Sequence, residues 1–149
     1  MPGLRRQGRT LALQLLYQTE MNPELGTETI EQFWSSADAS KRARAFAMQL
    51  FEGTRANLTT IDGMLSDCLE NWKLSRLSVV VRNLLRMAVW EMVHLGESPH
   101  AVVIDEAVSV ARDFEDDESA RFVNGVLQRC WEAGRADNTG TGGTGGTGA

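Results

Sequence analysis

The chain has few of the residues from which metal sites and disulfides are built. Its 149 residues include two cysteines and two histidines. Cys68 and Cys130 each stand among apolar neighbours at helical spacing, so we interpret them as small buried hydrophobic residues in a reducing, cytoplasmic protein. His94 and His100 have no cysteine or second histidine at ligand spacing. The sequence therefore predicts no bound metal and no other cofactor.

Long apolar runs and an excess of positive charge are also missing. Gln14, Gln18 and Glu20 interrupt the apolar segment after Leu11, which argues against a signal peptide or a membrane span. The 15 basic residues are outnumbered by 20 acidic ones, and the formal net charge is −5. Such a protein has no long-range attraction to polyanions, so any nucleic-acid binding must be local.

Motifs of catalysis are scarce as well. The chain has no glycine-rich phosphate-binding loop and no Gly-x-Ser-x-Gly turn. The acidic run 115–118 is best explained as the start of a helix, where negative charge complements the helix dipole, and Ser119 is expected to cap that helix. We therefore predict that the protein is not an enzyme.

Helical periodicity dominates what is present. Apolar residues recur every three or four positions, and no alternating run of strand length stands out. Asn57 is placed to cap a helix that buries residues up to Trp72. Ser78 is placed to cap a central, largely apolar helix, which ends at Gly96 and Pro99. The pattern predicts an all-α fold, a compact bundle of about seven helices.

The composition changes abruptly near the C-terminus. From residue 135 onward the chain is mostly glycine and threonine and has no large apolar residue that could anchor it. We expect residues 1–134 to form one helical domain and residues 135–149 to form a flexible, disordered tail.

Three arginines near the N-terminus form a candidate binding patch. Arg5, Arg6 and Arg9 precede the first acidic residue, and Arg5 and Arg9 lie one helical turn apart. Such a cluster can bind phosphates, although three cations can equally be a solvated helix start. Arginine is unfavourable at a helix N-terminus, where the dipole prefers anions, so this placement needs a compensating function.

Gly125 interrupts a strongly helical segment near the other end of the chain. Glycine costs about 1 kcal/mol relative to alanine inside a helix and is usually kept for close packing or for the approach of a partner. If Gly125 faces another helix, Gly125→Leu should destabilise the protein through overpacking by roughly 1 to 3 kcal/mol.

Three segments carry a resemblance to a known family. Residues 9–17 read RTLALQLLY and continue directly from the arginine cluster. Residues 86–91 read RMAVWE, and residues 122–127 read FVNGVL. In this order the segments resemble those of the NusB family of transcription antitermination factors. The resemblance extends over about residues 5–132 and implies a bundle of two helical halves.

The resemblance implies a non-enzymatic factor that binds RNA. Members of this family pair with a small-subunit ribosomal protein, also called NusE. The heterodimer binds the single-stranded boxA element of ribosomal RNA leader transcripts, joins the RNA polymerase antitermination complex and suppresses premature termination. No membrane partner is implied, and the sequence leaves open whether the free protein forms a homodimer.

Family motifs at both ends of the chain supply the candidate RNA contacts. These are Arg5, Arg6, Arg9, Glu118, Arg121, Phe122 and Asn124. If Phe122 is exposed it can stack on an unpaired base, while Arg121 and Asn124 can reach phosphates or base edges. The alternative for Phe122 is an ordinary core position.

Other matched positions are expected to make contacts within the protein or with its partner. Arg86, Glu91 and Glu106 should orient helices through intramolecular polar contacts. For the protein partner, the resemblance indicates the positions Tyr17, Arg76, Val81 and Arg82. Val81 stands where family members often have an acidic residue, so a salt bridge from this position to a basic partner is not available.

The N-terminal patch also departs from the family pattern. Gly8 stands where a larger or charged residue is common. We therefore expect the chain alone to bind RNA weakly, and binding to tighten when the partner contributes its own charges.

Two other interpretations stay open. The same fold resembles the N-terminal domain of certain ribosomal RNA cytosine methyltransferases, and a helical scaffold with protein partners only would also fit. Charge reversal of Arg5, Arg6 and Arg9 separates the scaffold from an RNA-binding factor, because only the latter would lose RNA binding while keeping its protein partner.

Overall fold

The computed structural model describes the backbone of residues 3–148 and the side chains of residues 3–135. The described residues form helices and connecting loops, with no strand among them. The α-helices are α1 (Leu4–Met21), α2 (Thr27–Ser36), α3 (Lys41–Ala56), α4 (Leu58–Cys68), α5 (Val79–Trp90), α6 (His100–Phe114) and α7 (Asp117–Gly148). Short 3-10 turns lie at η1 (Pro23–Leu25) and η2 (Leu74–Arg76), and a π turn lies at η3 (Glu91–Leu95). The all-α prediction is confirmed.

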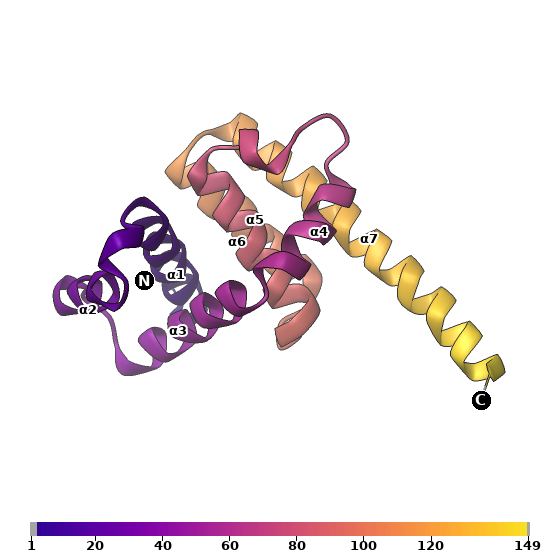
Figure 1. Ribbon diagram of the computed structural model, residues 1–149, viewed down its shortest axis with the longest axis horizontal. Helices are drawn as coiled ribbons and strands as arrows, with labels where there is room; N and C mark the ends of the chain where they lie inside the picture. The colour runs from indigo at the N-terminus through magenta and orange to yellow at the C-terminus, as the bar shows by residue number, and fades with distance from the viewer. Residues whose placement is uncertain (1–2, 149) are drawn as a thin grey trace.

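The helices form two groups around α5. In Figure 1, α1, α2 and α3 make up one half, while α5, α6 and α7 lie together in the other, where α4 packs against α5 and α7. α5 contacts α1, α3, α4, α6 and α7. Its side chains Leu84, Leu85 and Val89 are essentially inaccessible to solvent. The prediction of a central apolar helix is therefore confirmed.

Side-chain caps at helix starts agree in part with the sequence. The hydroxyl of Ser78 accepts the backbone N–H of Val81 at 3.1 Å and caps α5, as predicted. Asn57 precedes α4 but donates its side-chain amide to the carbonyl of Gly53 at 2.7 Å. A carboxylate oxygen of Asp116 accepts the N–H of Ser119 at 2.7 Å, so the prediction of Ser119 as the cap of α7 is wrong.

The end of the central helix contains a wider turn than the sequence indicates. The N–H of Gly96 donates to the carbonyl of Glu91, five residues earlier, at 2.9 Å. Gly96 then adopts the left-handed conformation, with φ 64°, that favours glycine. The predicted stop at Gly96 is confirmed. Glu91, the first residue of the π turn, is buried in the interior with 1 % exposure.

Two glycines permit close helix contacts. A Cβ atom at Gly8 would lie 2.6 Å from the ring of Phe46, and one at Gly53 would lie 2.0 Å from the indole of Trp90. At Gly125 a Cβ would meet the tip of Arg129 at 3.4 Å, which is ordinary contact. Of the two uses considered for Gly125, close packing against another helix is therefore not observed, because the only neighbour found there among the described residues belongs to α7 itself.

The cysteines and the last helix complete the fold. Cys68 and Cys130 are buried free thiols, as predicted, and burial raises the pKa of the Cys130 thiol. The backbone of α7 extends to Gly148 and projects beyond the other helices (Figure 1). The side chains predicted to form a flexible tail lie beyond residue 135, outside the described ones, so the division of the chain at 134 stays a prediction. None of the described helices combines the length and apolar character that crossing a membrane requires.

Candidate nucleic-acid interface

The first turn of α1 presents two exposed arginines. Arg5 donates to the hydroxyl of Ser98 at 3.1 Å and to Glu97 at 3.3 Å, and its side chain is 44 % exposed. Arg6 makes two hydrogen bonds to Glu106, at 2.8 and 3.3 Å, and is 50 % exposed. Surface ion pairs of this kind contribute at most about 1 kcal/mol. Both guanidinium groups can therefore exchange a carboxylate for a phosphate at low cost.

Arg9 differs from the other two because it is buried. Its Nε donates to one carboxylate oxygen of Glu91 at 2.8 Å, and its NH2 donates to the other at 2.5 Å. The side chains of Arg9 and Glu91 are 5 % and 1 % exposed. A phosphate could reach Arg9 only by displacing Glu91 from the interior. We therefore assign Arg9 to the joint between α1 and the end of α5 and leave it out of the RNA face.

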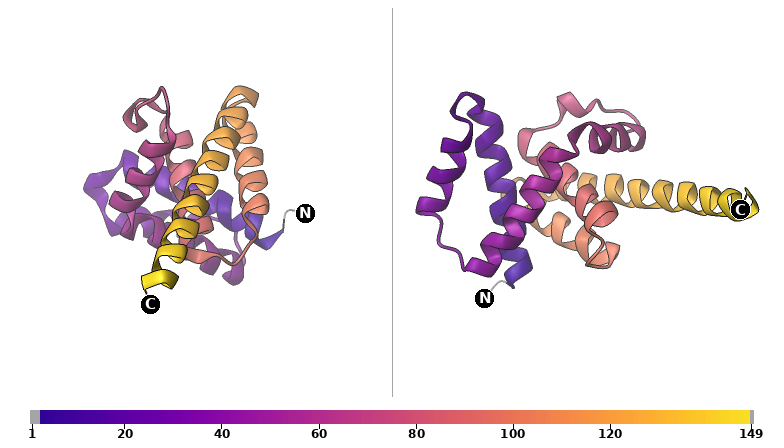
Figure 2. Two further views of the ribbon diagram at one scale, coloured as in Figure 1. Left: turned by 90° about the vertical axis from the view of Figure 1, so that its right-hand side faces the viewer. Right: turned by 60° about the horizontal axis from the view of Figure 1, so that its bottom comes forward.

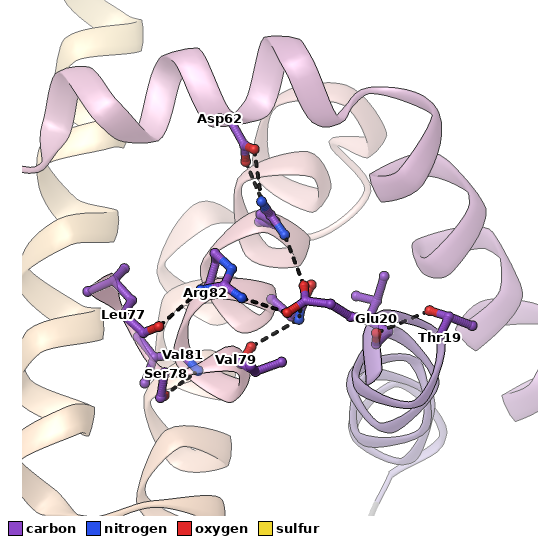
Figure 3. Close-up of polar contacts among 11 residues, drawn as sticks. Thr19, Glu20, Asp62, Leu77, Ser78, Val79, Val81 and Arg82 are labelled. Atoms are coloured by element: carbon purple, nitrogen blue, oxygen red, sulfur yellow. Dashed lines mark hydrogen bonds and ion pairs between the residues drawn. The ribbon is translucent and has the colours of Figure 1, made fainter. Parts of the chain in front are cut away.

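A second polar network joins α1, α4 and α5 at the other end of the bundle. Glu20 accepts a hydrogen bond from Arg82 at 2.6 Å and pairs with Arg86 at 3.5 Å. Arg86 also makes two hydrogen bonds to Asp62, at 2.8 and 2.9 Å. Figure 3 shows Glu20 and Arg82 pointing toward each other, with Asp62 reaching the network from α4. The carboxylates of Glu20 and Asp62 are each 31 % exposed, so this network is open to solvent.

These two sets of contacts confirm the expected roles of the matched charged residues. Arg86 pairs with Asp62, Glu91 pairs with Arg9, and Glu106 pairs with Arg6. Each pair joins two different helices. Their charges are therefore used within the molecule, as predicted.

An aromatic pocket of about 240 Å³ opens beside the start of α5. The residues that line it are Trp72, Arg76, Leu77, Ser78, Val81, Glu115, Glu118, Ser119 and Phe122. The pocket brings together positions predicted to contact RNA and positions predicted to contact the protein partner. Phe122 is half-buried, so it is neither a full core residue nor a free ring.

Sequence reasoning missed an exposed tryptophan of this pocket. Trp72 is 57 % exposed, and its ring meets Phe122 edge to face, with centroids 6.4 Å apart. The apolar spacing after Asn57 suggested that Trp72 is buried on a helix, but α4 ends at Cys68 and Trp72 lies in the following loop. The polar residues Glu70, Asn71 and Lys73 around it were the available signal for a loop.

The remaining predicted RNA contacts lie on the surface of α7. Glu118, Arg121 and Asn124 are exposed, and they follow one another by about one helical turn. They form a polar stripe that continues from the aromatic pocket toward Gly125, where the helix surface is open.

A separate groove surrounds Tyr17. Its volume is about 240 Å³, and it is lined by Leu13, Gln14, Tyr17, Gln18, Val80 and Phe114. Tyr17 is 37 % exposed and Phe114 is 40 % exposed. Of the other predicted partner residues, Arg82 is held by Glu20 and by the carbonyl of Leu77 at 3.0 Å. Tyr17 and the apolar groove around it are thus available to a partner, whereas Arg82 is largely occupied.

The predicted RNA residues fall into two patches, one at each end of α5. Arg5 contacts Ser98, which lies beyond the C-terminal end of α5. Phe122 shares its pocket with Ser78, the residue that caps the N-terminal end. Twelve helical residues span about 18 Å. The structure therefore does not merge the predicted RNA contacts into one cluster.

Neither histidine belongs to a metal site among the side chains that the structure describes. No group of three or more histidine, cysteine, aspartate or glutamate residues able to hold a metal ion occurs there. His100 instead stacks on Trp131, with ring centroids 4.2 Å apart and planes at 11°. His94 lies exposed in the π turn.

Comparison with known proteins gives a consistent family. The model of the NusB family matches residues 6–132. The transcription antitermination protein NusB of Sorangium cellulosum is 37 % identical over 136 residues, which cover 91 % of this chain and 97 % of the relative. The corresponding protein of Myxococcus xanthus is 40 % identical over 131 residues, covering 85 % and 94 %.

Solved structures agree with the sequence relatives. NusB of T. maritima superposes with a TM-score of 0.77 at 35 % identity, covering 87 % of this chain and 92 % of that one. A structure of the antitermination factors NusB and NusE in complex with dsRNA matches with a TM-score of 0.79 at 26 % identity, covering 89 % and 99 %. From its helical architecture, its sequence and these relatives, the chain belongs to the NusB family of transcription antitermination proteins, a family of non-catalytic factors.

Proposed function

We propose that this protein is an antitermination factor that binds the boxA element of ribosomal RNA leader transcripts as a heterodimer with the ribosomal protein NusE. In this function the heterodimer joins the RNA polymerase antitermination complex. The observation that carries the proposal is the match, over 89 % of the chain, to a structure in which NusB is complexed with both NusE and dsRNA.

The proposed RNA face combines phosphate contacts with base stacking. Arg5 and Arg6 supply exposed guanidinium groups whose present ion pairs are weak and exchangeable. Trp72 and Phe122 supply aromatic surface on which unpaired bases can stack, and Arg76 lies beside them. Single-stranded RNA is the form that such a surface suits, because its bases are free to leave the strand and stack on protein rings.

The proposed NusE face is the groove around Tyr17. It is mostly apolar, it borders the start of α5, and Phe114 closes it from the end of α6. Val81 is 6 % exposed and lines the neighbouring aromatic pocket. A carboxylate at position 81 would be largely desolvated, so in this chain the contact with the partner is apolar at that point.

The central experiment measures binding to a short single-stranded boxA-like RNA by fluorescence anisotropy over a range of salt concentrations. The protein is tested alone and with purified NusE, and an RNA of the same length and scrambled sequence is the control. We expect weak binding alone, tighter and salt-dependent binding with NusE, and a preference for the boxA-like sequence.

Charge reversal of the exposed arginines tests the assignment of the face. Arg5→Glu combined with Arg6→Glu should reduce RNA binding and leave the NusE complex intact by size-exclusion chromatography. If the protein and NusE form a complex that binds neither RNA, the proposed function is wrong and a protein-binding scaffold takes its place.

A further inference from the structure

The start of α3 carries a cluster of cations to which the family resemblance assigns no role. Lys41, Arg42 and Arg44 occupy the first turn of this helix, directly after its cap residue Ser40. All three are exposed. No ion pair between described side chains involves Lys41 or Arg42.

This cluster lies beside the arginines of α1. Gly8 lets the two helices approach so closely that a Cβ there would lie 3.3 Å from the carbonyl oxygen of Ala43. The side-chain amide of Gln7 donates to the carbonyl of Asp38, just before α3, at 3.3 Å. Both views in Figure 2 show the starts of α1 and α3 next to each other. The positive ends of two helix dipoles therefore converge at this point.

Cations from the two helices share one side of the contact. The guanidinium carbon of Arg5 lies 5.1 Å from the centre of the Phe46 ring. Arg42 precedes Phe46 by one helical turn and lies on the same side of α3. Arg44 turns to the opposite side, where it stacks over Trp34 at 5.0 Å. Arg5 and Arg42 thus border a common surface, and Lys41 precedes Arg42 at the exposed start of α3.

On α3 the placement of these charges is electrostatically unfavourable for the protein alone, whereas on α1 Glu97 and Glu106 compensate Arg5 and Arg6. Both first turns are fully described, and neither contains an acidic residue. Cations near a helix N-terminus are repelled by its dipole, whereas α7 shows the favourable arrangement, with Asp117 and Glu118 in its first turn. Two adjacent helix starts that both carry cations form a site that an anion would stabilise.

We propose that the first turn of α3 extends the RNA face of α1 and binds phosphates of the RNA backbone through Lys41, Arg42 and the α3 N-terminus. This inference rests on the proposed function and names a further part of the same interface. The contacts are to phosphates, so they add affinity without adding sequence preference. RNA is favoured over an acidic protein because the cluster continues the surface formed by Arg5 and Arg6.

The test compares two double variants that change the net charge equally. Lys41→Gln/Arg42→Gln removes the proposed contacts. Arg55→Gln/Arg135→Gln removes one exposed cation from the far end of α3 and one from α7, and serves as the matched control. RNA binding of each complex with NusE is measured against salt concentration. The Lys41/Arg42 variant should bind on the order of tenfold more weakly near 0.1 M salt, and its log–log salt slope should be shallower by about 1.4, for two lost phosphate contacts to a single strand.

Two further measurements separate loss of contact from loss of structure. The melting temperature of the Lys41/Arg42 variant should be unchanged or higher, because a repulsion with the α3 dipole has been removed. Arg42→Lys keeps the positive charge and should keep most of the affinity. If Arg42→Lys binds RNA as weakly as the Lys41/Arg42 variant, the proposal is overturned, because the proposed phosphate contact depends on positive charge and not on a particular side chain.

The outcomes distinguish this inference from the function on which it rests. If the unmodified complex binds RNA and the Lys41/Arg42 variant matches the Arg55/Arg135 control in affinity and slope, the α3 site is wrong and the proposed function stands. If the unmodified complex binds no RNA, both are wrong. If the variant loses NusE while RNA binding by the chain alone is unchanged, the cluster binds the protein partner and the RNA assignment is overturned.

Discussion

The two ends of α5 use similar charged residues in opposite ways. At the C-terminal end, Arg9 and Glu91 form a closed pair that solvent barely reaches, and Gly53 lets Trp90 pack tightly beside them. At the N-terminal end, Glu20 is shared by two arginines and remains 31 % exposed, next to two open pockets.

Burial, rather than residue type, decides what an arginine does in this fold. A buried pair costs several kcal/mol to break, because either partner alone is left as an uncompensated charge. A network whose carboxylates are 31 % exposed can rearrange more easily, because water can replace part of a lost contact. The closed end therefore maintains the fold, and the open end is where a partner can change the contacts.

The largest effect is expected for Glu91→Gln at the closed end. The substitution keeps the shape of the side chain but leaves the Arg9 charge buried without a counter-charge, so we expect a loss of about 3 kcal/mol in the free energy of unfolding. Urea unfolding followed by circular dichroism measures this. Glu20→Gln at the open end is the counterpart and should cost less, because Glu20 is 31 % exposed and Arg86 keeps its pair with Asp62.

A double substitution checks the cause of that loss. Arg9→Met combined with Glu91→Leu removes both charges together and should be much less destabilising than Glu91→Gln alone. Equal losses for Glu91→Gln and Glu20→Gln would contradict the contrast between the two ends of α5.

The next largest effect concerns the two glycines. Gly53→Ala places a Cβ against the rigid indole of Trp90, where the available distance is 2.0 Å, so we expect a loss of roughly 1 to 3 kcal/mol. Gly125→Ala meets only ordinary contact at 3.4 Å and should stabilise α7 by up to about 1 kcal/mol. Thermal melts of the two variants should shift in opposite directions. A lower melting temperature for Gly125→Ala would contradict this, because it would show that a Cβ atom at position 125 meets a close neighbour.

Trp72→Ala tests the open end through binding rather than stability. Trp72 is 57 % exposed, so its truncation should change the free energy of unfolding by no more than about 1 kcal/mol. If an RNA base stacks on this ring, affinity for RNA should fall about tenfold. Trp72→Phe retains an aromatic face and should retain most of the affinity. Unaltered RNA binding by Trp72→Ala would remove this ring from the proposed interface.

The smallest effect is expected at the cap of α7. The backbone N–H of Ser119 holds the pKa of Asp116 below its ordinary value, so the capping contribution is complete above the unfolded pKa near 4 and is lost as the pH falls through the folded value. Asp116→Ala should therefore melt at a lower temperature than the unmodified protein at pH 7. The difference should shrink as the pH is lowered below about 4, and a difference that persists in acid would contradict the cap.

Much of the fold could be predicted from the sequence because it depends on local patterns. Apolar spacing gave the helices, and the Ser78 cap and the Gly96 stop depend on residues within a few positions of them. The cap of α7 was predicted wrongly, because the acidic run offers several adjacent capping groups and spacing alone does not choose Asp116 over Ser119. The length of α4 was overestimated for a similar reason, since an apolar residue after a helix continues its pattern.

The site was harder to predict because contacts between distant segments decide which of its residues are buried and which are exposed. Arg5 and Arg9 lie one turn apart on the same helix, and the sequence around them does not distinguish them. Arg9 is buried because it pairs with Glu91, which is 82 positions away along the chain. Gly125 appears in a matched motif, whereas the closely packed glycines are those that happen to face Phe46 and Trp90. Which side of a helix is covered is set by tertiary packing, and a single sequence does not state it.

The unequal exposure of two tryptophans gives the molecule built-in optical probes. Trp72 lies largely in solvent at the open end, and Trp90 is 9 % exposed at the closed end. An indole in water emits at longer wavelength than one in an apolar interior, so in a variant with the partly buried Trp34 and Trp131 replaced by Phe the emission comes from these two environments. Quenching confined to the red side of the spectrum would report a ligand at the aromatic pocket, while a red shift of the blue component would report opening of the helix joint, without any added label.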